Sequence, residues 1–212
     1  MKLKKIASLA LAGIMAVSML AGCSNGNGGN DGETVVVPSD MTGKVIAALD
    51  EDTTKNVTFQ ADASLQTVLE KVVKNKGTSV SAVTLAELQK VEPNLVGDDQ
   101  LVAIGNKNDK DTATAASKTD KYTFVMNNGW TDGASEEYIA KEIASKIDNA
   151  VASGKIGETK KSQTFTYADD DFHYEFNYTG DVAVAEVTDT VTGVTSYVAV
   201  CTITRSANKV VE

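Results

Sequence analysis

The chain has 212 residues, of which 20 are basic and 29 acidic, and its formal net charge is −9. Its 42% hydrophobic and 23% charged content is typical of a globular protein, and the acidic balance argues against nucleic-acid binding, which needs a basic face. One histidine and two cysteines leave little material for zinc, haem or iron–sulfur sites, so no cofactor is expected.

The first 22 residues have the pattern of a secretory signal peptide. Three lysines precede an apolar stretch from Ile6 to Leu20, which is shorter than the roughly 20 residues of a membrane-spanning helix. The stretch ends in Leu20-Ala21-Gly22-Cys23. This sequence, in this place, resembles the lipobox of bacterial lipoproteins. The resemblance implies cleavage before Cys23, a lipid on the Cys23 thiol, and attachment to the cell membrane on its extracytoplasmic face.

Residues 23–38 are expected to form a flexible lipidated tether. The segment Ser24–Gly32 reads SNGNGGNDG and has no apolar side chain, so it cannot bury surface to offset the entropy of ordering. Removal of residues 1–22 with their three lysines leaves 190 residues, 17 basic and 29 acidic, with a net charge of −12. Anionic headgroups repel such a domain, so the lipid itself is expected to hold it at the membrane.

Residues 39–212 are predicted to form an α+β domain, either as one body or as two subdomains, 39–105 and 121–212. Apolar spacing and capping residues predict helices at 41–49, 65–73 and 84–91. Short apolar runs predict strands at 35–37, 57–60 and 101–104. The polar, low-complexity segment 105–121 is either a long loop or a linker between the subdomains.

The second half is predicted to contain a strand at 122–126, a long helix and a four-stranded antiparallel meander. Apolar residues recur every four positions from Ile139 to Val151, which predicts the helix. Polar breaks at 169–171, 179–181 and 192–193 separate the strands of the meander. The predicted fold is therefore α+β, with amphipathic helices packed on an antiparallel sheet. A helix followed by a meander is similar in layout to cystatin-like and PepSY-type modules, a similarity of pattern that carries no functional residue.

Two aromatic features are candidate binding sites. Phe172, Tyr174, Phe176 and Tyr178 lie on one face of a predicted strand, where they either contact a sugar or peptide, or form the core under a helix, as alternation alone favours. Trp130 lies in a polar, turn-rich segment and is either an exposed binding anchor or a residue that packs the turn against the long helix. Exposure of Trp130 and Tyr174 on one face would favour binding.

His173 is the only histidine, so a Ser/His/Asp or Cys/His enzyme would have to use it. Alternation places it on the strand face opposite the aromatic residues, where it is a third candidate binding residue. No Gly-x-Ser-x-Gly motif is present, and the position of Cys201 in its strand predicts a buried, unreactive thiol. The acidic run Asp169–Asp171 follows no calcium-loop spacing and is expected to be a solvated turn without a metal. No catalytic residue is therefore assigned.

The sequence favours a membrane-anchored extracytoplasmic lipoprotein that acts as a non-catalytic binding or envelope-assembly module. Its partner is an unknown protein, peptide or glycan. The alternative is an extracytoplasmic hydrolase that acts on cell-wall or peptide material through His173. A solute-capture subunit of a transporter is a third possibility, for which the chain is small.

Overall fold

A computed structural model describes residues 39–77, 79–97, 117–131, 134–152, 162–167, 170–189 and 191–211. Residues Pro38–Glu212 form one compact unit. The predicted signal peptide, Cys23, the tether and the strands predicted at 35–37 and 101–104 lie outside the described residues, as does most of segment 105–121. In the part of the chain that is described, no helix is long and apolar enough to span a bilayer.

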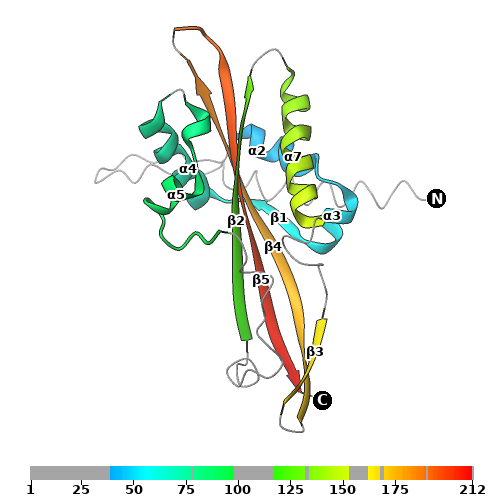
Figure 1. The fold of residues 1–212 in the computed structure, drawn as a ribbon. Helices are drawn as coiled ribbons and strands as arrows, with labels where there is room; N and C mark the ends of the chain where they lie inside the picture. Colours follow the sequence, from blue (N-terminus) through cyan, green and yellow to red (C-terminus); the bar gives the residue numbers. More distant parts are fainter. Residues whose placement is uncertain are drawn as a thin grey trace, which may run out of the picture. The chain divides into compact units, whose positions relative to one another are not determined.

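Five strands form one mixed sheet (Figure 1). They are β1 (Thr58–Ala61), β2 (Ser117–Thr131), β3 (Ser162–Tyr167), β4 (Asp170–Thr188) and β5 (Thr195–Val211). The order is β1–β4–β5–β2, and β3 pairs with the start of β4 beside this path. β1 runs parallel to β4, and the other pairs are antiparallel. The predicted α+β class is confirmed, but the expectation of a purely antiparallel sheet is wrong.

The predicted four-stranded meander is also wrong, because the break predicted at Thr179–Asp181 lies inside one continuous strand, β4. Three strands, not four, follow the long helix among the described residues. Gly180 explains the difference. A Cβ at Gly180 would overlap with ring carbons of Phe59 from β1 and lie 3.2 Å from Cδ1 of Ile203. The glycine therefore serves close packing within an extended strand and not a turn.

Five α-helices and one 3-10 helix are described around the sheet. They are α2 (Asp40–Ala47), α3 (Glu51–Asn56), α4 (Ala63–Lys76), η1 (Val80–Ala82), α5 (Leu85–Gln89) and α7 (Glu136–Ala152). The side chains of Ser39, Asp62 and Thr84 accept hydrogen bonds from the first turns of α2, α4 and α5. These N-caps satisfy backbone N–H groups that have no partner within the helix, and each helix begins within two residues of its predicted start.

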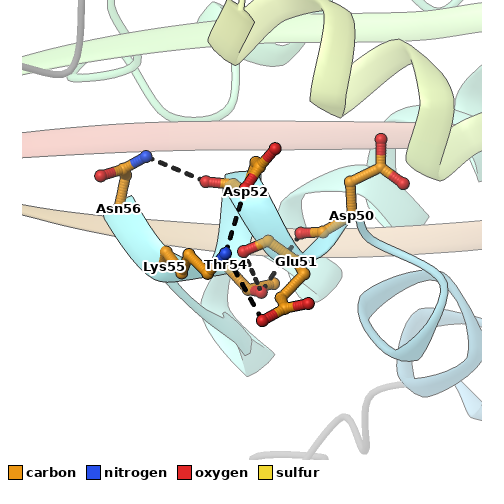
Figure 2. Close-up of polar contacts among 6 residues, drawn as sticks. All are labelled: Asp50, Glu51, Asp52, Thr54, Lys55 and Asn56. Carbon is orange, nitrogen blue, oxygen red and sulfur yellow. Dashed lines mark hydrogen bonds and ion pairs between the residues drawn. The ribbon is translucent and has the colours of Figure 1, made fainter.

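Helix α3 was not predicted, because its six residues carry no apolar stripe (Figure 2). Polar contacts within the helix hold it instead. The Lys55 ammonium lies 3.2 Å from a carboxylate oxygen of Asp52 and 3.4 Å from one of Glu51. The side chains of Thr54 and Asn56 donate to backbone carbonyls one turn earlier. Such short-range contacts add little each, so packing of α3 against its neighbours is needed as well.

The core consists of two apolar clusters, one on each face of the sheet. Helices α2 and α7 contribute to the first cluster, which contains Val45, Ile143 and Ile147. Helices α4 and α5 contribute to the second cluster, which contains Leu69 and Leu88. Figure 1 shows these two groups of helices on opposite sides of the strands. Because β1 and α4 pack on β4, the two predicted subdomains share one sheet.

Candidate functional site

The two halves of the long strands β4 and β5 have different surroundings. In the half that contains Ala183 and Val200, apolar side chains on both faces are buried. In the other half, which we call the distal half, β4 runs from Asp170 to Asp181 and pairs with β5 from Thr202 to Val211. Figure 1 shows this half extending past the labelled helices. Its two faces are chemically opposite, and each is described below.

One face of the distal half is aromatic and buried. Tyr174, Phe176 and Tyr178 have at most 7% of their surface exposed, and Tyr174 has none. The alternation in β4 is therefore that of a core strand, which was one of the two interpretations of the aromatic stripe. Burial raises the pKa of the Tyr174 and Tyr178 hydroxyls. As a candidate binding residue, Tyr174 offers no exposed surface to a ligand.

A buried ion pair lies on the same face. An Nη2 atom of Arg205 in β5 donates to Oδ2 of Asp120 in β2 at 2.9 Å, and both side chains are almost fully buried. The guanidinium also lies 5.3 Å from the ring centroid of Phe176, which is cation–π distance. Arg205 is the only arginine of the chain. Sequence reasoning missed this pair, although Arg205 continues the buried alternation of Cys201 and Ile203 in β5.

The opposite face of the distal half is polar and exposed. Strand pairing places its side chains in three rows across β4, β5 and β2: Thr179–Thr204–Lys121, Asn177–Ser206–Thr119 and Glu175–Asn208. We call these eight residues the distal polar face. Six of them are exposed, and the two central residues, Thr204 and Ser206, are half-buried.

A row of hydrogen-bonded residues separates the distal polar face from the covered half. The hydroxyls of Thr123 and Thr202 lie 3.0 Å apart and are buried. In the same row, Gln60 of β1 donates to Asp181 at 2.9 Å. Desolvation raises the pKa of the Asp181 carboxyl. The Thr123 backbone N–H donates to the Val96 carbonyl, so the segment after α5 reaches the sheet at this row.

The distal polar face is nearly neutral in an acidic protein. It has one cation, Lys121, and one carboxylate, Glu175, and its other six side chains are hydroxyls and primary amides. Hydroxyls and amides both donate and accept hydrogen bonds. The face can therefore hydrogen-bond to a ligand that also donates and accepts, and it has no surplus charge to attract an ion.

The three residues predicted as binding candidates do not form one site. In the strand register, Trp130 lies opposite Tyr197, which also pairs with Glu186 of β4. Tyr174 is 12 residues from Glu186 along β4, or about 40 Å in an extended strand. His173 pairs with Thr164 of β3 and Val210 of β5, and the side chains of His173 and Trp130 lie outside the description. Trp130 and Tyr174 therefore cannot share one small surface.

The remaining candidate groups in the described ranges are Cys201 and the acidic side chains. Cys201 is fully buried, as its strand position predicts, and desolvation raises the pKa of its thiol well above the usual value. Among the described residues, no three His, Cys, Asp or Glu side chains are placed to hold a metal ion. The acidic residues around α3 are partly neutralised by Lys55, and Asp148 accepts from the Asp50 backbone N–H.

Comparison with known proteins identifies no relative. No protein-family model matches the chain, and no curated protein or solved structure is significantly similar to it.

Proposed function

We propose that this protein is an extracytoplasmic lipoprotein, anchored to the cell membrane through Cys23, that acts as a non-catalytic binding or envelope-assembly module. We further propose that the distal polar face is its binding surface. The observation that carries the second proposal is the contrast along one sheet face: buried Ala183 and Ala185 give way to exposed Thr179 and Asn177 on the same strand.

A ligand bound to this open face would lie along its surface and would not be enclosed by the protein. Side chains on neighbouring strands are about 4.8 Å apart, and same-face residues along a strand are about 6.7 Å apart. The eight residues therefore offer hydrogen-bonding groups over a broad, regular area. The buried Arg205–Asp120 pair and the aromatic side chains on the other face support the sheet from behind. Such support fixes the positions of the exposed groups before a ligand binds.

Anchoring is tested by the two cysteines of the chain. The full-length Cys23→Ala variant should leave the membrane fraction, because a lipid bound to that thiol is proposed to be the anchor. The matched Cys201→Ala variant should stay in the membrane fraction, because it retains Cys23. Membrane association that is equal in the Cys23→Ala variant and the unmodified protein would contradict the anchoring proposal.

Binding is tested with two matched pairs of substitutions in the same two strands. Thr179 and Thr204 pair directly on the distal polar face, and Thr188 and Thr195 pair directly at the other end of β4 and β5. The detergent-solubilised full-length protein should be retained by an envelope fraction. The Thr179→Val/Thr204→Val variant should lose most of this retention, and the Thr188→Val/Thr195→Val variant should keep it. Equal retention of the two variants would show that binding occurs elsewhere.

The same preparation separates binding from hydrolysis. A non-catalytic module releases no soluble sugar or peptide from the envelope fraction over time. If release is observed and the His173→Ala variant abolishes it, the protein is a hydrolase and the non-catalytic proposal is wrong.

A further inference from the structure

The place where the N-terminal segment reaches the domain is fixed by hydrogen bonds to β4. The Ser39 hydroxyl donates to the Val184 carbonyl at 2.9 Å, and the Val184 backbone N–H donates to the Thr42 hydroxyl at 3.1 Å. Gln66 of α4 donates to the same Val184 carbonyl at 3.0 Å. These side chains hydrogen-bond to the backbone of β4 at Val184, beyond the end of its pairing with β1. No other strand of the described residues pairs with this edge of β4 at Val184. The chain therefore enters the domain beside Val184.

The distal polar face lies well away from this entry point. Thr179 is five residues and Glu175 nine residues from Val184 along the extended strand β4, which corresponds to about 17 to 30 Å. The distal polar face is therefore separate from the contacts that Ser39 and Thr42 make with β4.

The chemistry of the distal polar face excludes several classes of partner. A lipid surface is bound by apolar side chains or a surplus of Lys and Arg, and the face has neither. A nucleic acid also requires a basic surface. Protein interfaces have their binding energy concentrated in aromatic and arginine side chains at the centre, whereas the centre of this face is Thr204 and Ser206. A neutral, polyhydroxylated ligand belongs to none of these three classes.

We propose that the occupant of the distal polar face is a neutral glycan polymer, an inference that rests on the proposed binding function. Sugar hydroxyl and acetamido groups donate and accept hydrogen bonds, as do the hydroxyls and amides of Thr179, Thr204, Ser206 and Asn177. The eight residues of the face include no aromatic side chain on which a sugar ring would stack. Each sugar is therefore held weakly, and retention requires a polymer that contacts several rows at once.

The test uses the full-length protein in detergent and three insoluble, neutral polysaccharides: chitin, cellulose and a β-1,3-glucan. The protein should be retained by at least one polymer, and the corresponding monosaccharide should not displace it at millimolar concentration. Retention should fall about ten-fold in the Thr179→Val/Thr204→Val variant, in which two hydrogen-bonding groups are lost. It should be unchanged in the Thr188→Val/Thr195→Val variant. Circular dichroism of both variants checks that each is folded.

Different failures have different meanings. If the protein is retained by none of the three polymers but by untreated envelope, and protease treatment of that envelope removes retention, then the partner is a protein. The glycan inference is then wrong and the binding function stands. If polymer retention is equal in the two threonine variants, then the distal polar face is not the site. If neither envelope nor polymer retains the protein, both the inference and the proposed function fail.

Discussion

The ring of Phe59 covers Gly180, so that a single missing Cβ allows β1 to pack against the middle of β4. The two residues are partners in the parallel register of β1 and β4. Ile203 of β5 lies on the other side of the glycine, 3.2 Å from the position of a Cβ. Strand β1 belongs to the N-terminal part of the domain, and β4 to its C-terminal part. The contact between Phe59 and Gly180 therefore joins these two parts within one sheet.

The first prediction concerns this contact. Gly180→Ala should lower the free energy of unfolding by about 1 to 3 kcal/mol, because the new methyl group overlaps with the Phe59 ring in a packed site. Urea unfolding followed by circular dichroism measures the change. Gly43→Ala in α2 is the matched control, because a Cβ there meets no atom within 4 Å. The control should be neutral or stabilising by about 0.5 to 1 kcal/mol, since alanine favours a helix.

A double variant shows whether Phe59 is the cause. If the ring is responsible, Phe59→Ala should remove most of the additional cost of Gly180→Ala, and the two changes should not be additive. Additive effects would mean that another contact requires the glycine, such as the one with Ile203.

Helices α2, α4, α5 and α7 were predictable because their signals are local. Ser39, Asp62 and Thr84 cap α2, α4 and α5, and each stands directly before the helix that it caps. The hairpin at Thr192-Gly193 was predictable for the same reason, since Gly193 has a positive φ of 74° and Asp189 accepts from two backbone N–H groups of the turn. Each of these signals depends on residues within a few positions of one another.

The long strand β4 and the distal polar face were not predictable in this way. Thr179-Gly180-Asp181 has the composition of a turn, and only its tertiary neighbour Phe59 shows why a glycine is needed in a strand. The sequence predicts a break at these three residues. The change from alanine to threonine and asparagine on one face of β4 therefore falls in two separate predicted strands. The parallel pairing of β1 depends likewise on contacts between distant residues, which no local pattern specifies.

The second prediction concerns the buried ion pair of Asp120 and Arg205. Asp120→Ala should destabilise the protein by about 3 to 5 kcal/mol, because it leaves the guanidinium buried without a counter-charge. Asp120→Ala combined with Arg205→Met should recover much of this loss, since no unpaired charge then remains buried. Thermal and urea unfolding of the three proteins measure the effect.

An exposed ion pair is the control for this comparison. Lys44 of α2 pairs with Glu136 of α7 at the surface, where both side chains are well exposed. Lys44→Ala should change the unfolding midpoint little, because solvent screens exposed pairs. A double Asp120/Arg205 variant that is less stable than Asp120→Ala alone would show that the guanidinium stabilises the aromatic face independently of Asp120.

The third prediction concerns two carboxyls whose pKa values move in opposite directions. Desolvation raises the pKa of Asp181 above the usual 3.8, so its charged form opposes folding at neutral pH. Asp181→Asn should therefore stabilise the protein at pH 7, and this gain should disappear as pH falls through the raised pKa toward 3.8. Urea unfolding between pH 3 and pH 7 measures it. A gain that is independent of pH would exclude ionisation as the cause.

Asp189 should behave in the opposite way. Hydrogen bonds from the backbone N–H groups of Thr192 and Val191 lower the pKa of the Asp189 carboxyl below 3.8. Its charged form thus favours the folded state, and this stabilisation is present above pH 3.8 and lost as pH falls through the lowered pKa. Asp189→Asn should therefore destabilise the protein at pH 7 and have less effect in stronger acid. The same pH series measures both variants.

The last prediction uses the reactivity of the two cysteines. Cys201 is fully buried and the pKa of its thiol is raised, so it should not react with iodoacetamide in the folded protein at pH 7 to 8. In denaturant it should react fully. If Cys23 carries the lipid as a thioether, the denatured mature protein should incorporate one carboxamidomethyl group, which mass spectrometry counts. Incorporation of two groups would show that Cys23 is a free thiol, and labelling of Cys201 before unfolding would show that the sheet opens at β5.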